Sequence, residues 1–277
     1  MQLLSFQAEA RAPLWPWVAA AMILHATETG QGSPIALLHG LFGAGRSLGP
    51  VQRRLAGSFR VIALDLRNHG TSPHAFGMDY PAMATDVAET LAARAALPAS
   101  LLGHSMGGKV AMRLALERGE LVRALVVADI APVPYPPHHR DLLAAMQELA
   151  LSPGLTRAAA DAAIAGAVPD ARVRGFLLQN LLVGANPSWR IGLSEIAAAM
   201  PALEDFPELP AARYAGPALF VAGGRSDYLR PELHSRIRTL FPQALFATLT
   251  NAGHWLHADD PAGFLAVVAP FLSASTR

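Results

Sequence analysis

The chain contains no cysteine among its 277 residues. This absence excludes disulfide bridges, thiolate metal sites and a cysteine nucleophile. Charged residues are also scarce, at 16% of the chain, and the 22 basic residues are scattered among 21 acidic ones without a basic cluster. Because proteins usually bind nucleic acid through a concentrated positive patch, the sequence predicts no nucleic-acid partner. The 52% of hydrophobic residues are enough for one large globular core.

The N-terminal region lacks an apolar run long enough to span a bilayer. The stretch LWPWVAAAMIL, residues 14–24, is shorter than the ~20 residues that a membrane helix needs, so no stable membrane insertion is predicted. Residues 1–21 are interpreted as an arm outside the fold, because Glu9 and Pro16 interrupt the pattern of a signal peptide. The predicted location is the cytoplasm, with export as the alternative if this arm is a leader.

Short apolar runs that end in polar or glycine-rich turns alternate with helix-like segments along the chain. Near-continuous apolarity is typical of strands buried on both faces, as in a parallel sheet. The alternation predicts an α/β fold with a mostly parallel sheet. The predicted strands are residues 35–39, 60–65, 100–104, 124–130, 218–222 and 244–250, and the predicted helices are residues 79–97, 109–118, 231–241 and 261–272.

One region interrupts this alternation. After Ile130 the chain runs through the proline-rich sequence APVPYPPHH, and residues 140 to about 210 follow as alanine-rich helical segments without a clear strand. Ligands of open α/β sheets bind at the carboxyl ends of the strands, so a helical insertion there is expected to form a lid. The predicted division is a core of residues 22–132 and 208–277 and a lid of residues 133–207.

Residues 103–107 read GHSMG and match the G-x-S-x-G pattern of a nucleophilic serine. The motif follows a predicted strand and precedes a predicted helix, which is the context that this pattern requires, so Ser105 is the predicted nucleophile. Residues 103–109, which include this motif and Lys109, also fit G-x-x-x-x-G-K, the pattern of a phosphate-binding loop. Val110 stands where that loop needs a Ser or Thr to bind magnesium, which disfavours a nucleotide site. Lys109 is therefore interpreted as a surface or helix-start residue.

A developing oxyanion next to Ser105 needs backbone N–H donors. Residues 39–43, HGLFG, form a glycine-rich loop after the first predicted core strand, where such a donor is expected. The predicted donors are the N–H groups of Leu41 and Met106, with Phe42 as the alternative to Leu41.

The remaining members of a triad follow in the order Ser, acid, His along chains of this type. His254, in NAGHW after the last predicted strand, is the predicted base, and His257 is its competitor. Asp129 and Asp227 both follow predicted strands, and either could accept the imidazole N–H and fix its tautomer. The choice between the two aspartates stays open at this stage.

Together these residues resemble the α/β-hydrolase superfamily, and more narrowly the small YbfF-type bacterial esterases and their animal mitochondrial relatives. The resemblance runs from about residue 35 to residue 272. Arg67, Asn68 and His69 belong to its specific phrase RNHGTSPH and are expected to shape a loop near the site without a catalytic role. The phrases that carry it, in order, are LLHGLFG, ALDLRNHGTSPH, YPAMATDV, LLGHSMGGKVAM, DIAPV and NAGHWLHADDP.

The resemblance implies an α/β-hydrolase fold with an eight-stranded, mostly parallel sheet, flanking helices and a helical lid after strand six. It implies hydrolysis of carboxylic esters or thioesters with short to medium acyl groups through an acyl-enzyme, without cofactor or metal. In the narrow group the acid matches Asp129, and in the wider superfamily it matches Asp227. The oligomeric state is not predicted.

Three other functions compete with ester hydrolysis. A perhydrolase or haloperoxidase-like reaction, or hydrolysis of a C–C bond, would use the same triad, because such specificity lies in the shape of the pocket. A non-catalytic binding module on this fold is a more remote alternative. A metal site at His138 and His139 is disfavoured, because no acidic partner stands at ligand spacing.

Overall fold

A seven-stranded, mostly parallel sheet forms the centre of the computed structural model, which describes residues 22–209 and 211–275. The strand order is β1-β3-β2-β4-β5-β8-β9, and β1 pairs with β3 in antiparallel orientation. Residues of β4 and β8 are buried along their whole length, as expected for strands with helices on both sides. The strands are β1 (Ala26–Thr29), β2 (Pro34–Leu38), β3 (Arg60–Leu64), β4 (Ala99–His104), β5 (Val122–Ala128), β8 (Ala218–Gly223) and β9 (Ala244–Leu249).

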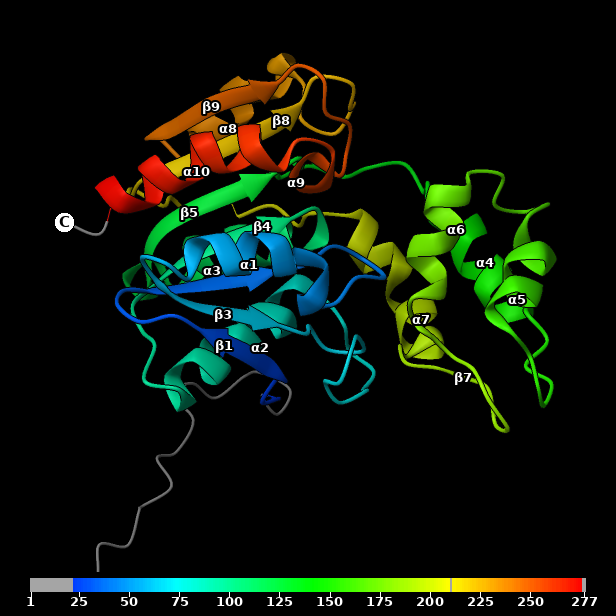
Figure 1. Cartoon of the computed structure of the whole chain (residues 1–277). Helices are drawn as coiled ribbons and strands as arrows, with labels where there is room; N and C mark the ends of the chain where they lie inside the picture. The colour runs from blue at the N-terminus through cyan, green and yellow to red at the C-terminus, as the bar shows by residue number, and fades with distance from the viewer. Residues whose placement is uncertain (1–21, 210, 276–277) are drawn as a thin grey trace, which may run out of the picture.

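Helices cover both faces of this sheet (Figure 1). Helices α1 and α10 pack on one face, and α2, α3 and α8 pack on the other. Asp79 and Asp260 cap the starts of α2 and α10, where each side chain accepts a backbone N–H, and a proline in each first turn fixes a helical φ. The core helices are α1 (Gly49–Leu55), α2 (Tyr80–Ala93), α3 (Met106–Glu117), α8 (His234–Leu240), α9 (Leu256–Asp259) and α10 (Pro261–Ala274), with short 3-10 turns η1 (Gly45–Leu48), η2 (Gly119–Leu121) and η3 (Pro231–Leu233).

The predicted α/β fold and its predicted strands are confirmed, but the expected strand count is not. Where the resemblance implied eight strands, the described residues contribute seven to the sheet, so the insertion follows β5, the fifth strand in the chain, rather than a sixth. At one edge of the described sheet, β1 is a four-residue strand that pairs with β3. The predicted arm of residues 1–21 lies outside the described residues.

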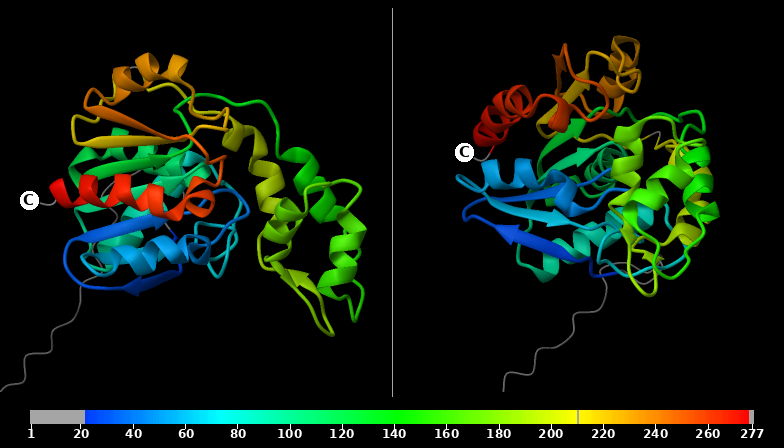
Figure 2. Two further views of the ribbon diagram at one scale, coloured as in Figure 1. Left: turned by 45° about the horizontal axis from the view of Figure 1, so that its top comes forward. Right: turned by 45° about the vertical axis from the view of Figure 1, so that its right-hand side comes forward.

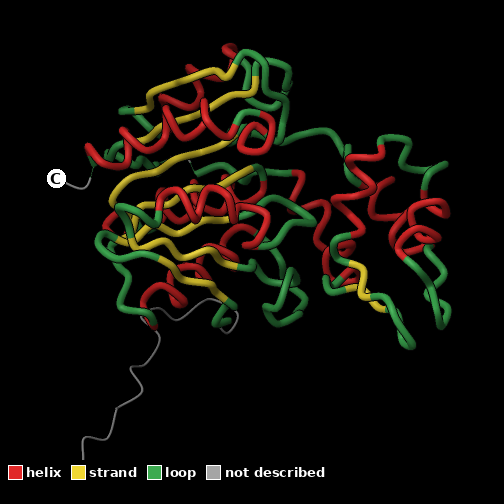
Figure 3. Tube along the Cα trace, in the orientation of Figure 1, coloured by secondary structure: helices red, strands yellow, loops and turns green. Residues whose placement is uncertain are grey.

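The segment between β5 and β8 forms a helical insertion beyond the carboxyl ends of the strands (Figure 2). It also contains a short antiparallel hairpin of two two-residue strands, which the expectation of a region without a clear strand did not include (Figure 3). Strands of two residues have no period that a sequence pattern can reveal. The elements of the insertion are α4 (Arg140–Glu148), α5 (Arg157–Ile164), α6 (Ala171–Leu178), β6 (Leu181–Leu182), β7 (Ser188–Trp189) and α7 (Leu193–Glu204).

A buried ion pair fixes the loop that follows β3. Arg67 Nε and Asp86 Oδ2 are 2.6 Å apart, and the two side chains are at most 3% exposed. Burial raises the pKa of Asp86, while the Arg67 guanidinium lowers it. Arg67 also donates to the carbonyl of Gly77 at 2.6 Å, so one side chain ties the loop to α2 and closes it on itself. The pair has a structural role, and the loop carries its neighbour His69 toward the site.

Candidate active site

Ser105 lies at a sharp turn between β4 and α3. Its backbone has φ 53° and ψ −120°, a conformation that L residues rarely adopt. A Cβ on Gly103 would come within 2.2 Å of the carbonyl oxygen of Gly107, and a Cβ on Gly107 within 2.3 Å of the carbonyl oxygen of Leu38. Both glycines of the G-x-S-x-G motif are therefore required by the close approach of the backbone.

His254 and Asp129 are joined by a hydrogen bond of 2.7 Å between Nδ1 and Oδ2. Asp129 follows β5 and is fully buried, and its other oxygen accepts the N–H of Gly223 at 2.9 Å. Ser226 Oγ donates to the same Oδ2 atom that His254 contacts. A carboxylate can only accept, so the proton of His254 sits on Nδ1 and leaves a lone pair on Nε2.

The structure shows which of the two candidate aspartates contacts His254, a choice that the sequence left open. Asp227 lies in the turn after β8 with its side chain exposed to solvent, whereas Asp129 is fully buried against His254. In that same turn the neighbouring Ser226 points inward to the Asp129 carboxylate. Adjacent residues in a tight turn face different sides, so a shift of one position decides which side chain reaches the site.

Aromatic rings hold His254 in place. The Tyr228 ring stacks on the imidazole with centroids 4.2 Å apart, and the His104 Nε2 atom is 2.8 Å from the backbone oxygen of His254. The competitor His257 lies in α9, 8% exposed, and its Nδ1 atom has no hydrogen-bond partner within the described residues. Burial lowers the pKa of His257 to about 4. Without an orienting carboxylate, His257 does not have the arrangement of a catalytic base.

Ser105 and His254 open into one cavity of about 270 Å³. In the described structure no hydrogen bond joins the two side chains, and in catalytic sites such bonds often tighten only when substrate binds. His138 and His139, where the sequence disfavours a metal site, also line this cavity. No group of metal-binding side chains sufficient to hold an ion occurs among residues 22–209 and 211–275. Its apolar walls are Leu41, Phe42, Leu48, Leu142, Val173, Phe176, Leu177 and Trp255.

The predicted oxyanion donors lie in two segments, the loop of residues 39–43 after β2 and the start of α3. Met106 is the first residue of α3, where a backbone N–H has no partner within the helix. The N–H of Phe42, the alternative donor, is already bound to Nε2 of His69 at 3.1 Å. His69 Nδ1 lies 2.9 Å from the backbone oxygen of Arg67, and burial lowers the pKa of His69 to about 3, so the ring is neutral and Nε2 accepts. Of the two candidate donors in this loop, Phe42 thus has its N–H occupied, and Leu41 is the candidate that remains.

Lys109 lies in the first turn of α3, which agrees with the helix-start interpretation, but it is buried and is not a surface residue. Its side chain is 2% exposed, and Nζ donates to the carbonyl oxygen of Asp205 at 2.8 Å, at the end of α7. The rings of Tyr80 and Tyr135 lie 5.4 Å and 4.9 Å from Nζ. These contacts bind the nucleophile helix to the insertion. They give the side chain a structural partner and do not fit the alternative of a phosphate-binding lysine.

The burial of Lys109 predicts a dependence of stability on pH. Burial lowers the pKa of Lys109 to about 7 from its ordinary 10.5, so between these values the unfolded chain binds the proton that the folded chain has lost. Raising the pH across this window should then add up to about 1.4 kcal/mol of stability per pH unit, a gain that is lost as the pH falls through 7. The free energy of unfolding of wild type and Lys109→Met is measured in urea between pH 6.5 and 9.5. The value for wild type should rise with pH relative to that for the variant, and a constant offset between the two would contradict this.

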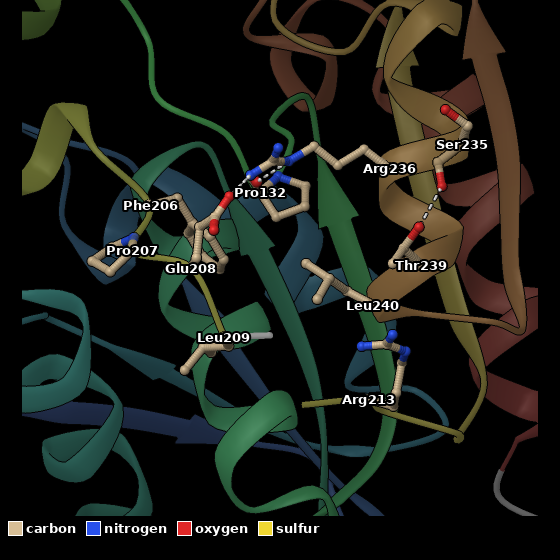
Figure 4. Close-up of a pocket in the computed structure, with 10 residues that line it drawn as sticks. All are labelled: Pro132, Phe206, Pro207, Glu208, Leu209, Arg213, Ser235, Arg236, Thr239 and Leu240. Atoms are coloured by element: carbon tan, nitrogen blue, oxygen red, sulfur yellow. Dashed lines mark hydrogen bonds and ion pairs between the residues drawn. The ribbon is translucent and has the colours of Figure 1, made fainter. Parts of the chain in front are cut away.

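A second cavity, of about 400 Å³, lies outside this site where the insertion rejoins the core (Figure 4). Arg236 of α8 contacts both chain segments that join the insertion to the core. Its Nε is 3.4 Å from the carbonyl oxygen of Pro132, between β5 and α4, and its guanidinium is 3.6 Å from the carboxylate of Glu208, between α7 and β8. Neither Ser105 nor His254 lines it. The second cavity is thus part of the junction between core and insertion and not of the reacting centre.

A serine at a strained strand-to-helix turn, sharing a cavity with a carboxylate-bound histidine, defines the nucleophilic hydrolases of the α/β type. The chain belongs to the alpha/beta hydrolase family, whose model matches residues 35–267. The predicted family and type of enzyme, a carboxylesterase-type hydrolase, are confirmed. No helix within the described ranges is long and apolar enough to cross a membrane.

Relatives at the level of sequence and of structure agree with this membership. The chain is 41% identical over 248 residues to mouse sn-1-specific diacylglycerol lipase ABHD11, covering 86% of this chain and 80% of that protein. It is 36% identical over 244 residues to esterase YbfF of Escherichia coli, covering 88% and 94%. A solved marine microorganism esterase superposes with a TM-score of 0.88 at 32% identity, covering 91% of this chain and all of the other.

Proposed function

We propose that this protein hydrolyses carboxylic esters with Ser105 as nucleophile, His254 as general base and Asp129 as the residue that orients the imidazole. The observation that carries the proposal is the 2.7 Å bond from His254 Nδ1 to Asp129 Oδ2 beside Ser105 in one cavity. The carboxylate fixes the proton on Nδ1, so Nε2 is free to take the proton of Ser105.

The reaction proceeds through an acyl-enzyme. As His254 Nε2 removes the hydroxyl proton, Ser105 Oγ attacks the acyl carbonyl, and the N–H groups of Leu41 and Met106 stabilise the oxyanion. His254 then gives the proton to the leaving alcohol or thiol. A water, deprotonated by the same atom, hydrolyses the acyl-serine and restores Ser105. Both N–H groups are fixed in the backbone and need no reorganisation when charge develops.

The size and lining of the cavity support small esters or thioesters with short to medium acyl groups as substrates. Its volume of about 270 Å³ and its walls of leucine, phenylalanine and tryptophan suit an apolar acyl chain of limited length. Residues of α6 form one wall, which supports a lid role for residues 133–207 over a core of residues 22–132 and 208–277. No contact among the described residues favours perhydrolysis, C–C bond hydrolysis or a binding module over ester hydrolysis.

Hydrolysis of p-nitrophenyl esters from acetate to palmitate, combined with labelling by a fluorophosphonate, tests this function. We expect turnover to be fastest for the short and medium acyl groups and to fall for palmitate, because the cavity is small. Mass spectrometry of the labelled protein should find one modification, on the peptide that contains Ser105. Absence of turnover with every ester, or a label on another residue, would contradict the proposal.

The cytoplasm remains the proposed compartment, with export as the alternative if residues 1–21 act as a leader. The described residues do not include that segment. Fractionation of cells that express the full chain, with a check of its mature N-terminus, decides between these locations.

A further inference from the structure

The peptide groups on both sides of Phe42 are held by buried side chains. Its N–H donates to His69 Nε2 at 3.1 Å, and its carbonyl oxygen accepts a hydrogen bond from Nδ2 of Asn180 at 2.7 Å. His69 and Asn180 are at most 1% exposed. Phe42 has φ 60°, a left-handed conformation that is costly for a residue with a large side chain. The two hydrogen bonds therefore stabilise a backbone conformation that the loop would not keep alone.

This conformation sets the direction of the proposed oxyanion donor. The N–H of Leu41 precedes the Phe42 peptide by one residue, so rotation at Phe42 would also turn the segment that carries Leu41. Gly43 N donates to the carbonyl oxygen of Gly40 at 2.9 Å and closes the turn from its other side. A carbonyl oxygen can only accept, so the partner at the Phe42 carbonyl must be a donor, and Asn180 supplies it through its amide NH2.

Asn180 belongs to the helical insertion and not to the α/β core. It follows α6 in the insertion, 138 residues away from Phe42 in the chain, and its own backbone is fixed where Arg190 N donates to the Asn180 carbonyl oxygen at 2.8 Å. Figure 1 shows α6 beyond the carboxyl ends of the sheet strands, within the insertion. The position of the insertion is thus coupled to the conformation of the oxyanion loop through one buried bond.

Two side chains of α6 contact the segment that carries the base, Arg172 near the start of the helix and Phe176 near its end. The Phe176 ring lies 5.3 Å from the ring of Trp255, the residue after His254. Arg172 Nη2 is 2.5 Å from Asp259 Oδ1, although this pair is more exposed to solvent. Helix α6 and the residue Asn180 that follows it therefore contact both the segment of the base and the oxyanion loop, so a movement of α6 affects both.

We propose that Asn180 is a positioning residue for the oxyanion hole. This inference rests on the proposed function of the same site. With α6 closed over a bound ester, the Asn180 amide holds the Phe42 carbonyl and keeps the Leu41 N–H directed at the carbonyl that becomes the oxyanion. The contribution of Asn180 is made mainly in the transition state, because charge on that oxygen develops only there.

The test compares Asn180→Leu and Asn180→Asp with Gln179→Leu, a change of the neighbouring exposed amide side chain. Each protein is titrated with a fluorophosphonate so that rates refer to active sites, and misfolding then lowers the number of sites rather than kcat. We expect kcat for a short p-nitrophenyl ester to fall about 10- to 100-fold in both Asn180 variants, with KM changed less than about threefold. Gln179→Leu should keep the wild-type values.

A trifluoromethyl ketone gives an independent measure of the oxyanion hole. Ser105 Oγ adds to its carbonyl, the carbonyl oxygen becomes an oxyanion and the hydroxyl proton passes to His254, so the adduct resembles the tetrahedral intermediate. Its inhibition constant should rise in the Asn180 variants in proportion to the loss of kcat/KM. Unchanged kcat, or a rise of KM alone, in an active enzyme would overturn this role and leave the proposed function intact. An inactive wild-type protein would overturn both.

Discussion

Replacing Ser105 by alanine is expected to reduce ester hydrolysis by about 10⁵- to 10⁶-fold in kcat, leaving only the rate that binding and the oxyanion donors support. In the proposed mechanism the hydroxyl oxygen of Ser105 forms the bond to the acyl group. Without this oxygen no acyl-enzyme can form. The backbone should tolerate the change, because alanine has the same Cβ at the strained φ of 53°. Steady-state assays with a short p-nitrophenyl ester measure the loss, and fluorophosphonate labelling should disappear.

The matched control is His254→Ala, alone and combined with Ser105→Ala. Because nucleophile and base act as a unit, each single variant should fall to a similar floor, and the double variant should be no slower than Ser105→Ala. Additive losses would show that the two residues act independently. A Ser105→Ala protein with near wild-type turnover would rule out the proposed mechanism.

Three site residues share an unusual backbone conformation. Phe42, Ser105 and Asp129 have φ values of 60°, 53° and 53°, and each follows the carboxyl end of a sheet strand directly or within a short loop. Such conformations cost of order 1–3 kcal/mol each and persist only where surrounding contacts fix them. Hydrogen bonds at Phe42 and Asp129 and the two close-packed glycines around Ser105 supply those contacts. The site is therefore held by the fold before any substrate is present.

Local features of the sequence were sufficient to predict the core of this enzyme. Continuous apolar runs gave the buried strands, because helices cover both faces of the sheet. The glycines of GHSMG predicted the turn at Ser105. A Cβ on Gly103 would meet Gly107 within the motif itself, whereas the contact that requires Gly107 is to Leu38 of β2, elsewhere in the chain. The order of serine and histidine along the chain, together with the place of His254 after the last predicted strand, favoured His254 over His257. The structure places His254 beside Asp129.

Features that depend on long-range packing could not be predicted in this way. The burial of Lys109 depends on the end of α7, about 95 residues away, and nothing in its own helix turn indicates that contact. It is the single lysine among 22 basic residues, a count that could have drawn attention to it. His69 and Asn180 act on Phe42 from other segments, 27 and 138 residues away. Such pairings leave no period or motif in the sequence.

Asp129→Asn is expected to lower kcat by about 10⁴-fold, whereas Asp227→Asn should leave it within about twofold. An asparagine at position 129 would present an NH2 group to His254, so Nδ1 would have to accept and the proton would move to Nε2. That tautomer cannot take the proton of Ser105. Asp227 is exposed and lies outside the hydrogen-bond network of Asp129, Ser226 and His254. Turnover of a short p-nitrophenyl ester by the two variants measures the difference.

The two variants make the same chemical change and serve as controls for each other. Both remove one negative charge, so a general electrostatic effect would lower the two rates alike, while an effect on the tautomer is specific to position 129. The rate of fluorophosphonate labelling should fall with Asp129→Asn as well, because phosphonylation also needs His254 to accept the Ser105 proton. A large loss with Asp227→Asn and little with Asp129→Asn would instead assign the acid to Asp227. That result would require the turn after β8 to rearrange during catalysis so that Asp227 replaces Ser226 at the site.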